Sequence, residues 1–303
     1  MTGENSRKSP AMSRVAVVGP GAIGSVVAAW LMQGGHEVTV CARTPFAGLV
    51  IETPDGPIHA APRVITHAAD AEAVDWVLVA TKAYDVASTA PWLARLVGDG
   101  TRVAVLQNGV THIERFRPFV PEDRILPVVV NIPANRSAPG RVTQGAYGTL
   151  FAPAVANGED FAALFAASRI TVGTDADFIS RLWTKLCLNA TGAIPTLTLT
   201  ATGEAWSDGL ERLVRAVAEE TAAVARAEGA TIPQSVIETI VASAQKTRPG
   251  GVNSMHADRI AGRPMEIEER NGIIVELGKK HGIPTPVSDV IVELLRAIVV
   301  SRD

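Results

Sequence analysis

The feature that most constrains the fold is a glycine-rich turn, Gly19-Pro20-Gly21-Ala22-Ile23-Gly24, between the apolar run VAVVG and the helical pattern AIGSVVAAWLMQ. The first glycine of G-x-G-x-x-G permits a tight turn, the second a close approach of the backbone to a ligand, and the third close packing of helix and strand. A lone match would also fit an ordinary tight turn. At a strand-to-helix junction the motif predicts that the helix N-terminus binds a dinucleotide pyrophosphate. The expected contacts are Gly19, Gly21, Ala22, Ile23 and Gly24.

Around this turn, the first half of the chain alternates short apolar runs with helical stretches, a pattern typical of a parallel sheet covered by helices. The near-continuous apolar character of the runs indicates strands buried on both faces. We therefore expect an α/β, Rossmann-type domain. The predicted strands are Arg14 to Gly19, Glu37 to Ala42, Trp76 to Thr81, Thr101 to Gln107 and Ile125 to Asn131, and the predicted helices are Ala22 to Gln33 and about Asp85 to Val97. Between Pro133 and Val172, glycine-punctuated alternating segments predict antiparallel strands that end this sheet.

After about Thr174 the pattern becomes helical almost throughout, which predicts an all-helical C-terminal domain. The predicted organisation is a disordered leader at 1–13, an NADP-binding Rossmann-type domain at 14–175 and a helical substrate and catalytic domain at 176–303. The predicted helices are Phe178 to Ala190, Leu210 to Glu228, Pro233 to Lys246, Ile267 to His281 and Ser288 to Val299.

Composition excludes several classes of protein. With 31 acidic and 28 basic residues among 303, there is no electrostatic reason to expect nucleic acid or an anionic membrane as partner. No apolar stretch reaches the length of about 20 residues that a membrane span requires. The only two cysteines, Cys41 and Cys187, form no disulfide framework, so a reducing, cytoplasmic setting is expected. The histidines lack the spacing of metal ligands, and no metal is expected.

The residues after the second predicted strand bear on which dinucleotide binds. NAD-binding proteins place a carboxylate on the ribose 2′-hydroxyl roughly 20 residues after the loop. That window reads Val40-Cys41-Ala42-Arg43-Thr44 here, without a carboxylate. The guanidinium of Arg43 suits a 2′-phosphate, which favours NADP(H). A solvated arginine at a strand end is the alternative.

Lys185 and Asn189 lie four residues apart in SRLWTKLCLNATG and therefore share a helix face. A lone lysine on a helix is usually a solvated charge. This helix, however, is the first long one after the predicted dinucleotide domain. A lysine there could protonate the oxygen that becomes an alkoxide as hydride reaches a carbonyl carbon, and burial could lower its pKa toward neutrality.

A second polar segment, NSMHADRIAGRPMEIEERNG at 253–272, contains Ser254, His256, Glu266 and Asn271. Gly262 and Pro264 interrupt its helical pattern. The segment fits either a solvated helical face or part of a binding site.

Together these motifs resemble the ketopantoate reductase family. The resemblance runs from Arg14 over nearly the whole chain. It implies NADPH-dependent reduction of 2-dehydropantoate (ketopantoate), a small anionic 2-oxo acid, to pantoate, as in pantothenate biosynthesis. It rests on the glycine motif, Thr81-Lys82-Ala83, Leu106-Gln107-Asn108-Gly109, Trp183-Thr184-Lys185 with Asn189, and the segment from Ser254 through Glu266 to Asn271-Gly272.

The resemblance also implies roles for individual residues. Lys185 is similar to the family's general acid, and Glu266 to the carboxylate that binds the substrate hydroxyl near that lysine. Asn189 resembles the residue that helps to orient the substrate, and Ser254 the hydroxyl that binds its carboxylate. Asn108 resembles the residue that bridges the nicotinamide ribose and the substrate. Lys82 and Arg43 fall on the cofactor side.

One position departs from the family pattern. Members commonly carry a second asparagine eight residues after the lysine, and this chain has Ala193 there. The departure leaves open a reductase of another 2-oxo acid, or a β-hydroxyacid dehydrogenase, on the same scaffold. A non-catalytic NADP(H)-binding sensor is a further alternative, although it would need no proton donor. The apolar C-terminal helix could pack in the core or join two subunits, so a homodimer is possible.

Overall fold

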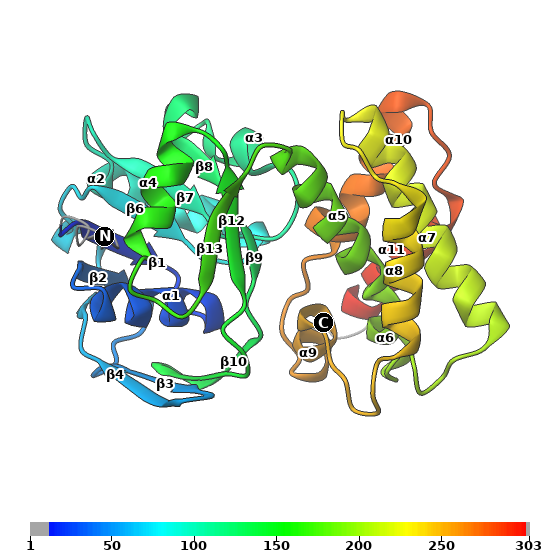
Figure 1. Ribbon diagram of the computed structural model, residues 1–303, viewed down its shortest axis with the longest axis horizontal. Coiled ribbons are helices and arrows are strands. Elements are labelled where there is room, and N and C mark those ends of the chain that lie inside the picture. The colour runs from blue at the N-terminus through cyan, green and yellow to red at the C-terminus, as the bar shows by residue number, and fades with distance from the viewer. Residues whose placement is uncertain (1–11, 301–303) are drawn as a thin grey trace, which may run out of the picture. The chain divides into compact units, whose positions relative to one another are not determined.

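Figure 1 shows the computed structural model, which describes residues 12–300 and divides into two units. The first unit holds the chain up to Gln107 and His112–Phe178, and the second holds Asn108–Thr111 and the chain from Ile179 onward. Of the predicted leader, residues 1–11 lie outside the described residues. The predicted boundary after residue 175 falls just before Phe178. The sequence pattern does not indicate that Asn108–Thr111 groups with the second unit.

A six-stranded parallel sheet lies at the centre of the first unit and confirms the predicted α/β class. Its order is β5-β2-β1-β6-β7-β8. Counted along the chain within this sheet, that is the 3-2-1-4-5-6 order of dinucleotide-binding folds. β6 is buried at every position, as expected for a strand covered on both faces. The strands are β1 (Arg14–Val18), β2 (Glu37–Cys41), β5 (Arg63–Ile65), β6 (Trp76–Val79), β7 (Arg102–Val105) and β8 (Ile125–Pro127).

The helices of the first unit follow the predictions in part. α1 covers Ala22–Gln33, as predicted. The predicted helix over Asp85 to Val97 is wrong in its first half: α2 covers only Ala90–Leu96 and follows two short 3-10 turns. Proline favours the first turn of a helix because it lacks an N–H donor, and Pro91 marks this late start. Further helices are α3 (His112–Phe116) and α4 (Ala156–Leu164).

The segments after Pro133 form strands, and β10–β11 and β12–β9 pair antiparallel as predicted, but the prediction that they end the central sheet is wrong. They contribute instead to two separate sheets, ordered β10-β11-β3-β4 and β13-β12-β9. β12 and β13 pair in parallel, because α4 lies between them as a crossover. β11 pairs in parallel with β3, part of a hairpin that was not predicted. The strands are β3 (Leu49–Thr53), β4 (Gly56–Ala60), β9 (Val129–Asn131), β10 (Ala134–Ala138), β11 (Arg141–Gln144), β12 (Thr149–Pro153) and β13 (Thr171–Asp175).

The predicted strand Ile125 to Asn131 is also two strands. β8 ends at Pro127 in the central sheet, and β9 begins at Val129 in the three-stranded sheet. Pro127 has no N–H with which to continue a ladder, which favours a change of partner at this point.

The second unit is helical, as predicted. Its core joins buried residues of α5, such as Trp183 and Leu186, to Val214 and Val217 of α7. The predicted helix Ile267 to His281 begins with a π-helical turn at Glu268–Gly272. The helices are α5 (Phe178–Thr191), α6 (Ala193–Thr198), α7 (Asp208–Ala227), α8 (Gln234–Gln245), α9 (Ser254–Ile260), α10 (Ile273–His281) and α11 (Pro286–Val300).

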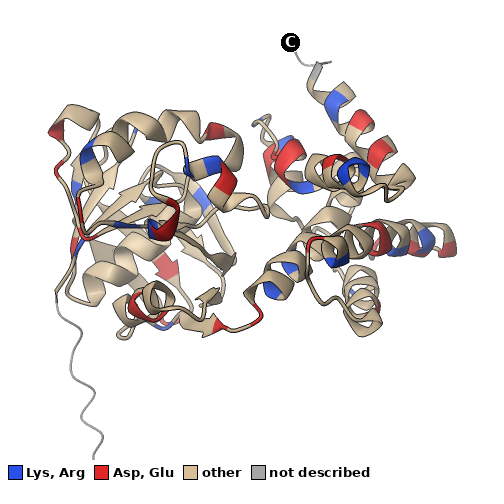
Figure 2. Cartoon of the chain, turned by 90° about the horizontal axis from the view of Figure 1, so that it is seen from above, with Lys and Arg blue, Asp and Glu red and all other residues tan. Residues whose placement is uncertain are grey.

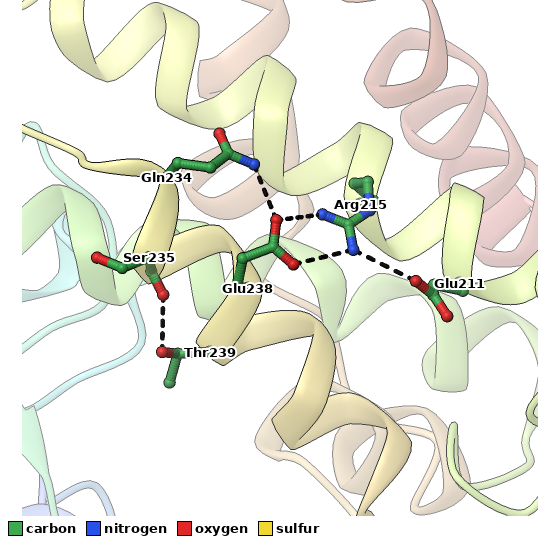
Figure 3. A network of polar contacts seen from close by, with 6 residues as sticks. All are labelled: Glu211, Arg215, Gln234, Ser235, Glu238 and Thr239. Atoms are coloured by element: carbon green, nitrogen blue, oxygen red, sulfur yellow. Dashed lines mark hydrogen bonds and ion pairs between the residues drawn. The ribbon is translucent and has the colours of Figure 1, made fainter.

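An ion-pair network joins the outer faces of α7 and α8 (Figure 3). Arg215 donates two hydrogen bonds to Glu238, at 2.6 and 3.1 Å, and one to Glu211 at 3.3 Å. Gln234 donates to the same Glu238 carboxylate at 3.0 Å. Such exposed pairs contribute little to stability because water screens them, so the buried apolar contacts hold these helices together.

Acidic and basic residues are interspersed in both units (Figure 2). Within residues 12–300, no helix combines the length and the apolar character needed to cross a membrane. Among the same residues, no group of three or more His, Cys, Asp or Glu side chains could hold a metal ion.

Candidate active site

The turn between β1 and α1 is shaped by the glycines that the motif predicted. Gly19 has a φ of +91°, which side chains other than glycine rarely adopt. A Cβ on Gly24 would lie 2.2 Å from the carbonyl oxygen of Gly19, so helix and strand could not approach as closely. A Cβ on Gly21 would meet no atom within 4 Å. The space in front of Gly21 is therefore open to a ligand.

The N-terminus of α1 leaves hydrogen-bond donors available. The first N–H groups of a helix have no intrahelical acceptor, and Gly21 at the N-cap has no side chain to cap them. These groups belong to Ala22, Ile23 and Gly24, which the sequence predicted as cofactor contacts. The partial positive charge of the helix end suits a phosphate.

Other predicted cofactor residues follow neighbouring strands at the same carboxyl edge of the sheet. Arg43 comes after β2; its side chain is 91% exposed and pairs with Asp85 at 3.8 Å. Lys82 comes shortly after β6 and is half-buried. Gln107, after β7, donates to Thr81 Oγ1 at 2.9 Å and to the Lys82 carbonyl at 3.3 Å. The parallel strands thus bring Arg43 and Lys82 to the edge that carries the glycine turn. Asp85 was not predicted to face Arg43.

In the second unit, α5 carries Lys185 and Asn189 one turn apart. The pKa of Lys185 is lowered to about 8, chiefly by burial. The nearby guanidinium of Arg270 contributes to this lowering, whereas the carboxylate of Glu266 opposes it. A lysine with a pKa near 8 can give up its proton close to neutral pH, as a general acid must.

A chain of side-chain hydrogen bonds joins three other predicted residues. Asn189 Nδ2 donates to Asn108 Oδ1 at 3.4 Å, and Asn108 Nδ2 donates to Glu266 Oε2 at 2.9 Å. The Glu266 side chain is buried, with 3% of its surface exposed. The structure therefore brings together Asn108, Asn189 and Glu266, which are widely separated in the sequence.

Ser254, the first residue of α9, is exposed and accepts a hydrogen bond from Arg270 Nη1 at 3.2 Å. Asn253 caps α9: its Oδ1 accepts from the N–H groups of Met255 and His256, at 3.0 and 3.1 Å. Its Nδ2 donates to the carbonyl of Gly192 at 2.9 Å. Asn253 thus ties the turn that presents Ser254 to the end of α5.

Three side chains satisfy carbonyls at and just beyond the last turn of α5. Arg270 Nη2 donates to the carbonyl of Asn189, Asn271 Nδ2 to that of Ala190 at 3.1 Å, and Asn253 to that of Gly192. Arg270 and Asn253 were not among the residues predicted from the sequence. An asparagine directly before a helical pattern is a common N-cap signal and could have identified Asn253.

Two residues left open by the sequence are buried. Ala193, eight residues after Lys185, has no exposed surface and belongs to the apolar core of this unit. His256 is 3% exposed, and neither ring nitrogen has a hydrogen-bond partner among the described residues. Burial lowers the pKa of His256, so its neutral form is favoured at pH 7.

Comparison with known proteins gives consistent matches over both units. The family "Ketopantoate reductase PanE/ApbA" matches residues 15–157, and "Ketopantoate reductase PanE/ApbA C terminal" matches residues 177–299. The 2-dehydropantoate 2-reductase of Caulobacter vibrioides is 48% identical over 94% of this chain and 99% of the relative. The protein of the same name from Mycobacterium tuberculosis is 37% identical over 93% and 97%. Among solved structures, a PanE/ApbA family ketopantoate reductase from Ralstonia eutropha is 31% identical with a TM-score of 0.87, covering 95% of this chain and 99% of that one.

Proposed function

The chain belongs to the ketopantoate reductase family, and from this premise we propose that it reduces 2-dehydropantoate to pantoate with NADPH. The observation that carries the proposal is the placement of Lys185. It is a half-buried lysine with its pKa lowered to about 8, one helical turn from Asn189 and within the field of Glu266. A protein that only sensed NADP(H) would need no such proton donor.

The first unit has the features that NADPH requires. The open space at Gly21 and the uncapped N-terminus of α1 suit the pyrophosphate, and the exposed guanidinium of Arg43 suits the 2′-phosphate. Lys82 supplies a second cation at the same edge of the sheet. When bound, NADPH supplies the hydride that reduces the keto carbon and leaves as NADP⁺.

The second unit supplies the proton and the substrate contacts. As the keto carbon accepts hydride, its oxygen becomes an alkoxide, and Lys185 Nζ donates a proton to it. Asn189 and Asn108 orient the reacting group, Ser254 binds the carboxylate and the buried Glu266 accepts a hydrogen bond from the terminal hydroxyl. A site with a buried acceptor for one particular hydroxyl can discriminate strongly against substrates without it.

The substrate assignment is tested by initial rates of NADPH oxidation with 2-dehydropantoate and with a 2-oxo acid of the same skeleton that lacks the terminal hydroxyl. We expect kcat/KM for 2-dehydropantoate to be higher by at least about 100-fold, because the second compound leaves Glu266 without its donor. Equal or faster turnover of the second compound would make the enzyme a reductase of another 2-oxo acid. No turnover with any 2-oxo acid would favour the sensor.

The pH dependence tests the role of Lys185. The amine donates only in its protonated form, which predominates below its pKa. We therefore expect kcat for reduction to be steady below about pH 7 and to fall as pH rises through about 8. A profile that is flat up to pH 10 would contradict the role of Lys185 as general acid.

The cytoplasmic location, the pairing of two subunits and the individual contacts of the site are further predictions.

A further inference from the structure

We propose that Arg270 is a positioning residue for substrate binding and proton transfer: its guanidinium orients the hydroxyl of Ser254 toward the substrate carboxylate and sets the charge environment of Lys185. This inference rests on the proposed reduction of a 2-oxo acid. Arg270 lies in the π-helical turn between Glu266 and α10, and 1% of its surface is exposed.

The burial of Arg270 needs an explanation. Its pKa falls to about 10 through burial, so it remains charged at neutral pH. Replacing a buried ionic group with apolar side chains is often neutral or stabilising, so fold stability is a weak reason for keeping a charge here. Gly192 makes room for this guanidinium, because a Cβ at that position would lie 2.9 Å from Arg270 Nη2. The backbone conformation of Gly192 is ordinary helical, with φ −64°, so it is the close approach of the guanidinium that favours a glycine.

The contact with Ser254 has a definite polarity. A guanidinium can only donate hydrogen bonds, so Arg270 Nη1 occupies a lone pair of Ser254 Oγ at 3.2 Å. The O–H of Ser254 is then directed away from Arg270, on a residue that is exposed. A hydroxyl backed by a positive charge is a suitable donor to a carboxylate. Because Ala193 is buried and apolar, it cannot supply the contact expected of an asparagine there.

The same guanidinium acts on Lys185. The charged groups that affect Lys185 are Arg270, which favours loss of its proton, and Glu266, which opposes that loss. Those that affect Arg270 are Glu266 and Asp258, and Asp258 is itself paired with Arg263 at 2.8 Å. Removing the charge of Arg270 would remove the group that favours loss of the Lys185 proton and leave the opposing effect of Glu266. Lys185 would then hold its proton more tightly.

The test compares Arg270→Met with Arg270→Lys in the full-length enzyme. For Arg270→Met we expect KM for the 2-oxo acid to rise at least about tenfold, because Ser254 loses its orientation. We also expect the fall in kcat at high pH to move up by about one pH unit, because Lys185 keeps its proton longer. Arg270→Lys keeps the positive charge, so its pH profile should stay close to that of wild type. It loses the planar fork of the guanidinium, so KM should still rise, but less than in Arg270→Met.

A matched control is Arg259→Met. Arg259 lies in α9 and donates to the backbone carbonyls of Thr196 and Leu197. We expect this variant to lower the melting temperature without moving KM or the pH profile. A second measurement is the pair Ser254→Ala and Ser254→Ala/Arg270→Met. If Arg270 acts on KM through Ser254, adding Arg270→Met to Ser254→Ala raises KM by less than twofold.

The results distinguish an error in the role of Arg270 from an error in the proposed substrate. If wild type reduces a different 2-oxo acid, the proposed substrate is wrong, and the same comparisons are made with that acid. Wild-type KM and pH profile in Arg270→Met would overturn the role of Arg270, whatever the substrate. If Arg270→Met does not fold, Arg270→Lys decides: unchanged KM, or full additivity of Arg270→Lys with Ser254→Ala, overturns the proposal.

Discussion

The glycine turn of the first unit and the end of α5 in the second unit are both helix termini, yet they are built in opposite ways. At the turn, Gly19, Gly21 and Gly24 work by lacking side chains: the N–H groups of α1 have no side-chain cap and remain available to a ligand. Around the end of α5, carbonyls are bonded by Arg270, Asn271 and Asn253 from other segments. One terminus leaves its backbone groups open to a ligand, and the other has its backbone groups bonded by side chains from other segments.

This difference predicts different responses to mutation. A change in the turn should alter affinity for NADPH through the shape of the backbone. A change near α5 should alter chemistry or substrate binding through charge and hydrogen bonds, and leave NADPH affinity unchanged. The variants below test this separation.

The largest effect is expected for Lys185→Met. General acid catalysis typically contributes 10²–10⁴-fold, so we expect kcat to fall about 1,000-fold. Methionine preserves the length of the side chain and removes a charge that burial disfavours, so the melting temperature should be unchanged or higher. NADPH affinity, measured by fluorescence titration, should stay within twofold of wild type.

The control for this variant is Lys280→Met. Lys280 is 60% exposed and pairs with Glu228 at 3.0 Å on the surface of the same unit. It should retain wild-type kcat. Activity of Lys185→Met within tenfold of wild type would assign proton donation to another group.

The glycine turn is tested by a pair of alanine variants. In Gly24→Ala the new Cβ would lie 2.2 Å from the Gly19 carbonyl oxygen, so helix and strand must separate. We expect a loss of about 1–3 kcal/mol of unfolding free energy and weaker NADPH binding. In Gly21→Ala the Cβ meets no protein atom within 4 Å and the φ of −71° suits alanine.

Gly21→Ala should therefore fold normally and still bind NADPH at least about tenfold more weakly, because the new methyl occupies the approach of the pyrophosphate. Denaturant unfolding and NADPH titration measure the two quantities separately. NADPH binding by Gly21→Ala that equals wild type would show that the backbone at this position does not approach the cofactor.

Arg43→Ala addresses the choice of cofactor. Loss of the guanidinium should raise KM for NADPH about tenfold and leave KM for NADH unchanged, because only NADPH carries the 2′-phosphate. Stability should change little, since the Arg43–Asp85 pair is exposed. The matched control is Arg14→Ala, which removes a similar exposed pair with Asp75. It should change neither the KM for NADPH nor the KM for NADH. A wild-type preference for NADH would contradict the assignment.

The same contrast explains how much could be predicted from sequence. The turn is contiguous, so its residues and the bounds of α1 follow from local pattern. Lys185 and Asn189 share a helix face by spacing alone. Arg270 could not be found in this way, because its partners Ser254 and Asn189 lie 16 and 81 residues away.

Local geometry adds to that difficulty. A helical period of 3.6 assigns residue faces over Ile267 to His281, but the π-helical turn at Glu268–Gly272 shifts them. The hairpin β3–β4 was not predicted for a different reason: β4 is exposed or only half-buried throughout. It therefore lacks the apolar run that identified the central strands. In the first region the sequence missed a local departure from the helical period, and in the second it missed a strand with too little burial to leave an apolar run.

The smallest effects are expected for Asn253→Ala and its control Ser207→Ala. Both residues are N-caps: Ser207 accepts from the N–H of Leu210 at 3.2 Å, and Asn253 accepts from two N–H groups of α9. Losing a cap typically costs about 1 kcal/mol, so both variants should be destabilised by roughly that amount in denaturant unfolding. Asn253→Ala should lose more, because it also leaves the carbonyl of Gly192 without its donor. Only Asn253→Ala should raise KM for the 2-oxo acid, by a few-fold, because only Asn253 anchors the turn that presents Ser254. If the two variants had the same KM, Asn253 would join α9 to the end of α5 without positioning Ser254. The end of α5 would then differ from the glycine turn only in its contribution to stability.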